Sequence, residues 1–195
     1  MKSQAKTRMS PTQILLLGFI AIILIGTIIL KLPISNNGKD IKFIDAFFTS
    51  TSAVCVTGLI TKVPAEQFST FGQVVIMCLI QIGGIGFMTF ISLILMFIGK
   101  KINLSDRIII KESLNQESFS GMVGLIRRIF KYTFIFELIG ALLLAIRFIP
   151  EYGTNKGIFY SIFHSISAFC NAGFDLLGNN SISMYSGDWL VCLTL

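Results

Sequence analysis

Charged residues are scarce in this sequence. Asp, Glu, Lys and Arg make up 13% of its 195 positions, whereas about a quarter of the residues in a soluble globular protein are charged. Hydrophobic residues make up 53%, and the mean hydropathy is +0.78. These values argue against a soluble fold and predict a protein with several membrane-spanning segments.

Cysteine pairs are also lacking. The four cysteines, Cys55, Cys78, Cys170 and Cys192, lie in apolar runs, and no two of them form a CxxC motif. This spacing argues against a disulfide framework and against a zinc site. We expect the cysteines to be small buried hydrophobic residues.

The formal net charge is +6, yet the sequence carries no nucleic-acid-binding motif. Its basic residues gather at the N-terminus and within residues 100–131, next to apolar runs. They are Lys2, Lys6, Arg8, Lys100, Lys101, Arg107, Lys111, Arg127, Arg128 and Lys131. By the positive-inside rule, we expect both stretches on the cytoplasmic side of the membrane.

Three apolar runs predict membrane-spanning helices, at residues 14–30, 68–98 and 132–149. No small-residue cleavage site follows the first run, so we interpret it as a retained helix and not as a signal peptide. Residues 100–128 carry charges between apolar residues at helical spacing, which predicts an amphipathic linker on the membrane surface.

Residues 44–59 include the stretch FFTSTSAVCVTGL, which is apolar but too short to cross a bilayer. Two spans, 14–30 and 68–98, already separate the two cytoplasmic stretches. The short segment must therefore enter the membrane from the outside and return to the outside. We predict that it is a re-entrant loop.

The sequence repeats itself at an offset of 115 residues. Residues 47–59 then align with IFHSISAFCNAGF at 162–174, and six of the 13 positions are identical. The same offset places the first predicted span on the third. The predicted fold is an all-α polytopic membrane protein built from helix–pore loop–helix units in the same orientation. The first unit covers 1–99 and the second 129–195, with its loop at 158–174 and its second helix starting at 189.

Each repeated segment ends in a glycine, Gly58 or Gly173. Non-helical backbone at membrane depth is tolerated only where protein buries it or where it lines water. A short helix followed by extended backbone can aim carbonyl oxygens at one axis, and such carbonyls replace the hydration shell of a cation in potassium channels. Glycine lets backbones approach closely and adopts a positive φ without strain.

The stretches TSAVCVTGL and SAFCNAGFDLL, together with the linker LSDRIIIKESLNQ, resemble the Trk/Ktr/HKT superfamily of potassium transporters. The resemblance covers the whole chain and implies a bacterial plasma-membrane protein that takes up K⁺, often with Na⁺ dependence, and has no bound cofactor. It also implies four repeats around one pore, a homodimer in the bilayer and a cytoplasmic ring of nucleotide-binding regulatory subunits.

The resemblance further implies which backbone carbonyls face the ion. These selectivity-filter residues are Val54, Cys55, Val56, Thr57 and Gly58 in the first loop, and Phe169, Cys170, Asn171, Ala172 and Gly173 in the second. The chain holds only about one and two-thirds of the four repeats, and two loops cannot close a filter. We therefore expect a fragment of a longer chain or a truncated product, and the alternative function is a non-conducting membrane or assembly fragment.

Five further residues have two interpretations each. Asp175 is a candidate for the outer mouth of the pore, or else caps its loop. His164 is expected to be a hydrogen-bonded packing residue, with a pH sensor as the alternative. Glu137 lies inside the third span, where it acts in function, or else pairs with nearby Lys131 or extends its carboxylate to the cytoplasmic face. We expect Gly83 and Gly84 to allow close helix contact, with a hinge as the alternative.

Overall fold

The computed structural model describes residues 10–86, 89–90, 122–178 and 181–195. Within these ranges every named element is a helix, and one isolated antiparallel bridge joins Asn36 to Phe68. The helices of the first half are α1 (Pro11–Lys31), the 3₁₀ turn η1 (Pro33–Ser35), α2 (Phe43–Val54), α3 (Pro64–Gln67) and α4 (Thr70–Ile85). Those of the second half are α7 (Met122–Tyr152), α8 (Thr154–Phe169), the 3₁₀ turn η3 (Ile182–Tyr185) and α9 (Trp189–Thr194).

Helix α1 has strong signals at both ends. Ser10 Oγ accepts the N–H of Gln13 at 3.2 Å, and the Gln13 side chain accepts the N–H of Ser10 at 2.9 Å, which forms a capping box. The helix stops at Lys31, because Pro33 follows closely. Its 21 residues extend about 31 Å, enough to cross the hydrocarbon core.

Helix α4 is shorter than the predicted span at 68–98. Ser69 caps its start by accepting the N–H of Gly72. It ends at Ile85, because Gly86 adopts a φ of +88° that a continuing helix does not allow. The rest of the predicted span lies largely outside the described residues.

Helix α7 is longer than the predicted span at 132–149. It has 31 residues and begins at Met122, inside the stretch 100–128 that the sequence assigned to a surface linker. Residues 100–121 of that predicted linker lie outside the described part of the chain. The helix segments Thr12–Lys31 and Gly124–Tyr152 are long and apolar enough to cross a membrane.

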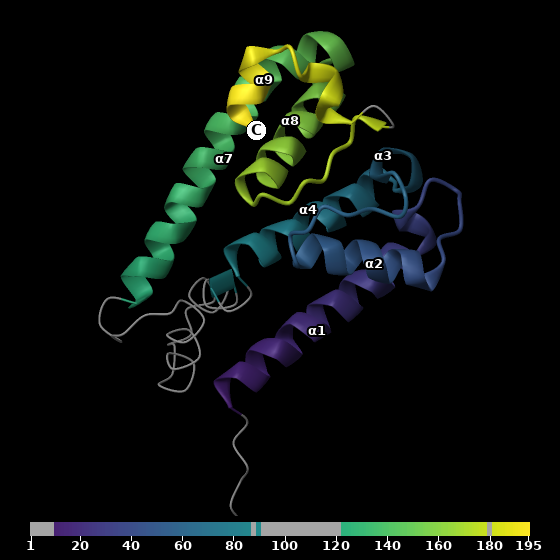
Figure 1. The fold of residues 1–195 in the computed structure, drawn as a ribbon, viewed down its shortest axis with the longest axis vertical. Helices are drawn as coiled ribbons and strands as arrows, with labels where there is room; N and C mark the ends of the chain where they lie inside the picture. The colour runs from purple at the N-terminus through teal and green to yellow at the C-terminus, as the bar shows by residue number, and fades with distance from the viewer. Residues whose placement is uncertain (1–9, 87–88, 91–121, 179–180) are drawn as a thin grey trace, which may run out of the picture.

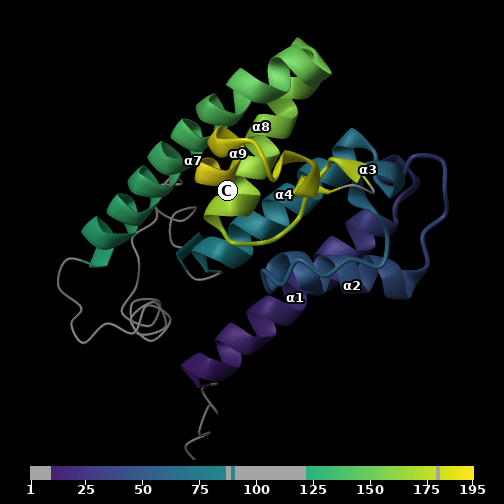
Figure 2. The ribbon, with the colours of Figure 1, turned by 45° about the horizontal axis from the view of Figure 1, so that its top comes forward.

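Helices α2 and α8 have only 12 and 16 residues, so they extend about 18 and 24 Å. Helix α2 packs on α1 and α4, while α8 packs on α7 and α4. Figures 1 and 2 show the resulting arrangement, with one group formed by α1–α4 and a second group formed by α7–α9. Helix α4 belongs to the first group and contacts α8 of the second. Each short helix therefore packs between two other helices, a longer helix of its own half and α4.

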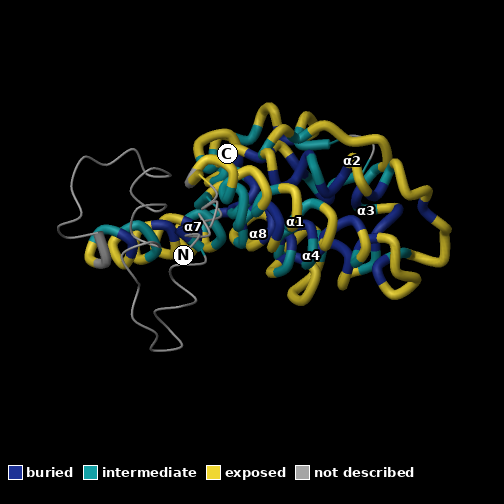
Figure 3. The backbone as a smooth tube through the Cα atoms, turned by 90° about the horizontal axis from the view of Figure 1, so that it is seen from below, coloured by how far each residue is buried: buried dark blue, intermediate teal, exposed yellow. Residues whose placement is uncertain are grey.

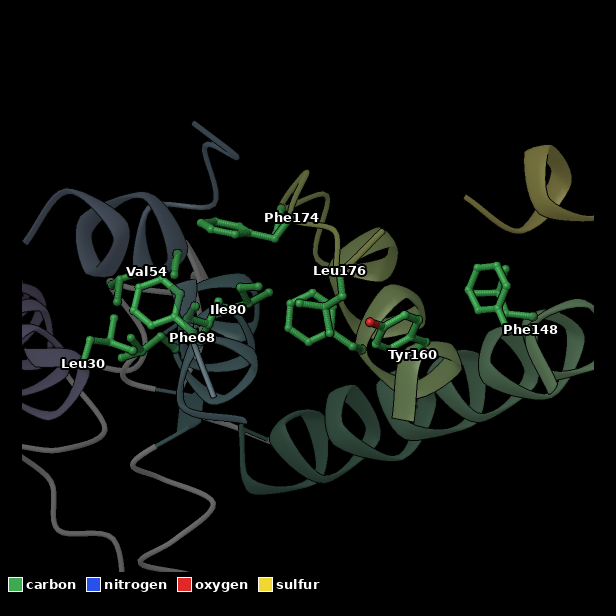
Figure 4. Packing of buried hydrophobic residues seen from close by; sticks show 14 of the residues in the cluster. Leu30, Val54, Phe68, Ile80, Phe148, Tyr160, Phe174 and Leu176 are labelled. Atoms are coloured by element: carbon green, nitrogen blue, oxygen red, sulfur yellow. The ribbon is translucent and has the colours of Figure 1, made fainter. Parts of the chain in front are cut away.

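The apolar core runs through both groups. Leu30, Val54, Phe68 and Ile80 are buried in the first group and belong to the same cluster as the second group's buried residues. Figure 4 shows Val54 and Ile80 on the side of this set that faces Phe174. In contrast, α1 and α7 expose apolar faces along most of their length (Figure 3). The exposed residues include Leu16, Ile25, Ile28, Phe134, Phe136, Leu142 and Ile146. Exposed apolar faces that extend along a helix are typical of contact with lipid or with other membrane segments.

The expectation that the cysteines are buried is wrong for three of them. Cys55, Cys78 and Cys192 are exposed, and Cys170 is intermediate. In a membrane protein, an apolar run faces lipid or neighbouring helices as readily as it faces a core, so an apolar setting does not predict burial. All four cysteines are free thiols, as their spacing indicated.

Candidate functional site

The loops that follow α2 and α8 have the same backbone hydrogen bonds at the 115-residue offset. Helix α2 ends at Val54 and helix α8 at Phe169, which are equivalent positions. In each loop three N–H groups fold back onto the last turn of the helix. The Val56 N–H bonds to Ala53 O (3.3 Å), and the Asn171 N–H bonds to Ala168 O (2.8 Å). Two further equivalent pairs complete the set. The pairs are Cys55 N–H to Thr51 O (2.8 Å) with Cys170 N–H to Ile166 O (3.0 Å), and Thr57 N–H to Ser52 O (2.9 Å) with Ala172 N–H to Ser167 O (2.7 Å).

The two loops also share unusual dihedral angles. Val56 and Asn171 have φ of +55° and +57°, while Gly58 and Gly173 have φ of +74° and +70°. A residue with negative φ followed by one with positive φ turns successive N–H groups to one side. Those N–H groups bond to the helix end, so the loop carbonyls turn away from it.

The loops touch at their glycines. A Cβ atom on Gly58 would lie 2.6 Å from the Ala172 carbonyl oxygen and 3.0 Å from the Cα of Gly173. No other residue type fits this approach without a backbone shift. Figure 4 shows the Phe174 ring, just beyond the second loop, extending toward Val54.

Helix α4 packs against both loops. A Cβ atom on Gly83 would collide with the carbonyl oxygen of Val54, and one on Gly84 would collide with the Sγ of Cys170. The expected packing role of Gly83 and Gly84 is therefore confirmed. The Val54 oxygen has α4 as a neighbour, which distinguishes it from the carbonyls farther along the loop.

Each short helix is fixed to a long helix by a serine. Ser50 Oγ donates to the Ile23 carbonyl at 2.8 Å, and Ser165 Oγ donates to the Glu137 carbonyl at 2.6 Å. A glycine near each contact, Gly26 in α1 and Gly140 in α7, leaves room for the hydroxyl. The two halves thus use the same device to bring a short helix close to a long one.

His164 and Asp175 both make local hydrogen bonds. The fully buried His164 bonds through Nδ1 to the Tyr160 carbonyl at 2.7 Å, and its Nε2 accepts the Leu176 N–H at 3.2 Å. The expected packing role of His164 is confirmed. Asp175 accepts the Leu177 N–H at 2.9 Å and the Ser181 hydroxyl at 2.6 Å, so both its oxygens order the loop beyond Gly173.

Glu137 does not pair with Lys131, so that interpretation of the sequence is wrong. Its side chain is 7% exposed and accepts a hydrogen bond from Gln81 Nε2 of α4 at 2.7 Å. Gln81 was not among the residues predicted from the sequence. In the sequence, Gln81 is recognisable only as an amide side chain within an apolar helix, and Gln73 of the same helix has the same feature.

Comparison with known proteins identifies the family of the chain. The family described as "TrkH: Cation transport protein" matches residues 2–195. The chain belongs to this family. Its members among curated proteins include the Ktr system potassium uptake protein B of Bacillus subtilis, 50% identical over 188 residues, and the potassium/sodium uptake protein NtpJ of Enterococcus hirae, 47% identical over 192 residues. The Ktr system potassium uptake protein B of Vibrio alginolyticus is 39% identical over 191 residues.

These relatives are longer than the chain. The alignments cover 96%, 98% and 97% of this TrkH-family chain, but only 42%, 43% and 41% of the three relatives. The chain therefore spans about two fifths of the length of the curated relatives that it matches.

Proposed function

We propose that this TrkH-family chain forms part of the pore of a potassium uptake system in the bacterial plasma membrane. The observation that carries the proposal is the pair of loops that share their backbone geometry and meet at Gly58 and Gly173. The functions named for the relatives, potassium uptake and potassium/sodium uptake, support the choice of ion.

In the proposed mechanism, carbonyl oxygens of the two loops replace part of the hydration shell of K⁺. The contributing residues are Val54 to Gly58 and Phe169 to Gly173. The Val54 carbonyl also packs against Gly83 of α4, so in the first loop the residues after it carry most of this role. Each loop follows a helix C-terminus, whose partial negative charge favours a cation nearby. Because the loop N–H groups already bond to the helix end, the carbonyls toward the glycines are free to serve the ion.

Asp175 is proposed to line the outer mouth of this pore. It lies two residues beyond Gly173, and a carboxylate there raises the local concentration of cations. Its two bonds within the loop hold the carboxylate in place and leave its charge available.

The remaining parts of the proposal follow from the family and the charge pattern. Residues 1–99 and 129–195 form two helix–pore loop–helix units, and the N-terminus and the linker 100–128 face the cytoplasm. Two more loops of this kind complete the filter. The whole system is a homodimer of membrane subunits on a cytoplasmic nucleotide-binding ring, and Na⁺ acts as a coupling ion.

The test is to express the open reading frame that contains this chain in a bacterium lacking its own potassium uptake systems. Growth at low K⁺ and an uptake preference for K⁺ over Na⁺ are expected. Gly58→Ser should lower both, because Gly58 has a positive φ and no space for a Cβ.

Gly38→Ser is the matched control for that substitution. Gly38 also has a positive φ, +72°, but no atom of the described residues lies within 4 Å of a Cβ built on it. It should therefore carry similar local strain and keep the ion preference. An unchanged preference in Gly58→Ser would remove the filter assignment.

A further inference from the structure

Glu137 differs from its counterpart in the first half of the chain. Its backbone carbonyl accepts the hydroxyl of Ser165, while the carbonyl of Ile23 accepts the hydroxyl of the equivalent Ser50. The packing of a short helix on a long one therefore works with isoleucine at this position. The carboxylate of Glu137 must be explained by something else.

The Glu137 carboxylate lies within the membrane-spanning part of α7 and is almost completely buried. Burying such a group is costly, and ionisable residues in membrane helices usually serve function. The Glu137 carboxylate accepts a hydrogen bond from a neutral amide, Gln81 of α4, at 2.7 Å. This bond joins the long helix of the second half to the last helix of the first half.

The bond also fixes which way the Gln81 amide points. The carboxylate takes the Nε2 group, so the Oε1 atom remains for another donor. That donor is the thiol of Cys170, whose Sγ lies 3.8 Å from Gln81 Oε1. The same sulfur packs against Gly84, one helical turn along α4. Glu137, Gln81 and Cys170 thus form one chain of hydrogen bonds that ends in the second loop.

The first loop has a different environment at the equivalent residue. Cys55 is exposed, whereas Cys170 is partly buried against α4. The second loop is therefore tied from the side by a polar chain, in addition to the bonds to its own helix that both loops share. Such outside support fixes the orientation of the peptide groups on either side of Cys170.

We propose that Gln81 and Glu137 are positioning residues that set the ion preference of the second loop. They act through the Cys170 side chain and do not touch the ion. This inference rests on the proposed function, because it concerns the same carbonyls. It adds that selectivity depends on a carboxylate of α7 that the first half of the chain lacks.

The experiment measures KM for K⁺ and the ratio of K⁺ to Na⁺ uptake, each corrected for the amount of protein in the membrane. Gln81→Leu and Glu137→Ile are each expected to change the ratio by about threefold or more, the scale of one hydrogen bond within a membrane protein. Their double variant should change it no further, because both remove the same chain of bonds. Glu137→Gln retains an acceptor for Gln81 and should stay near the wild-type ratio.

Gln73→Leu is the matched control, since it replaces the same residue type on the same helix. Its Nε2 donates to the Phe68 carbonyl at 3.0 Å and has no link to either loop. It should lower the amount of folded protein and leave the ion ratio unchanged. If Gln81→Leu fails to insert into the membrane, Gln81→Asn replaces it as the test variant. Its shorter amide cannot reach both Glu137 and Cys170, so it also interrupts the chain of hydrogen bonds.

An unchanged ratio in Gln81→Leu, or in Gln81→Asn where that variant replaces it, would overturn the inference, as would an equal change in Gln73→Leu. These outcomes differ from failure of the proposed function. If the wild-type reading frame restores no potassium uptake, the proposed function itself falls. If the wild type transports and the variants keep its ratio, only the positioning role falls.

Discussion

Gly58 and Gly173 are 115 residues apart in the sequence and lie against each other in the fold. The contact is not symmetric. A Cβ on Gly58 would lie 2.6 Å from a carbonyl oxygen of the other loop, while a Cβ on Gly173 would lie 3.3 Å from the Cα of Gly58. Both glycines have positive φ, so they share the strain of a substitution but not the collision.

This asymmetry predicts that Gly58→Ala is more harmful than Gly173→Ala. At Gly173 the cost is mainly the left-handed conformation, about 1–2 kcal/mol. At Gly58 the displaced backbone adds a further ~1–3 kcal/mol of overpacking. Thermal unfolding in detergent, with uptake measured in parallel, should rank wild type, Gly173→Ala and Gly58→Ala in that order. Equal losses in the two variants would contradict the contact.

Val56 provides a second prediction, because its φ of +55° is strained for a β-branched residue. The equivalent position of the second loop carries Asn171, which tolerates this conformation better. Val56→Asn should therefore raise the free energy of unfolding by about 1 kcal/mol, and Asn171→Val should lower it by a similar amount. Denaturation of both purified variants checks this, and a change of the same sign in both would refute it.

The sequence could predict the long helices and the two short helices before the loops, but it did not predict α3 or the 3₁₀ turns η1 and η3. Apolar runs and an offset of identical residues depend on local pattern, and these indicated α1, α2, α7 and α8. The end of α4 at Gly86 was not predictable, because the apolar run continues past it and glycine is common inside membrane helices. The start of α7 was missed for the opposite reason, since charged residues at Arg127 and Arg128 indicated a surface segment.

The site was predictable only where both loops carry the same signal. The glycines and the cysteines stood out because they repeat at a fixed offset. The partner of Glu137 did not, because it depends on how α4 and α7 are rotated against each other. Nothing in the sequence distinguishes Gln81, which faces Glu137, from Gln73, which bonds to the backbone of its own helix start.

Gly140 and Ser165 give a third prediction, about the contact between α7 and α8. A Cβ on Gly140 would collide with the hydroxyl of Ser165. Gly140→Ala should destabilise the protein by about 1–3 kcal/mol. Adding Ser165→Ala removes the colliding atom, so the double variant should be more stable than the sum of the two single effects allows. Thermal unfolding of all three variants measures this coupling.

Gly124→Ala is the control on the same helix. No atom of the described residues lies within 4 Å of a Cβ built there. Alanine favours a helix over glycine by about 0.8–1.0 kcal/mol, so this variant should be neutral or slightly more stable. A loss as large as that of Gly140→Ala would mean that the collision is not the cause.

Asp188 makes two kinds of bond that substitution can separate. Its Oδ1 caps α9 by accepting the N–H groups of Leu190 and Val191, while its Oδ2 lies 2.8 Å from Arg147 Nε in α7. Asp188→Asn keeps an oxygen for the cap and loses the ion pair, which is partly exposed and contributes about 0.2–1 kcal/mol. Asp188→Ala also loses the cap, which adds about 1 kcal/mol.

The dependence of stability on salt concentration separates the contribution of the ion pair from that of the helix cap. Raising the ionic strength screens the ion pair, so the difference between wild type and Asp188→Asn should shrink. The further difference between Asp188→Asn and Asp188→Ala should persist, because a neutral cap is not screened. Arg147→Gln removes the same ion pair together with the contacts of Arg147 to Glu151 and Tyr185, so it should cost at least as much as Asp188→Asn. The part of its effect that comes from Asp188 should vanish in the Asp188→Asn background. If Asp188→Ala were no less stable than Asp188→Asn, the cap would not hold the start of α9, and its position against α7 would depend on apolar packing alone.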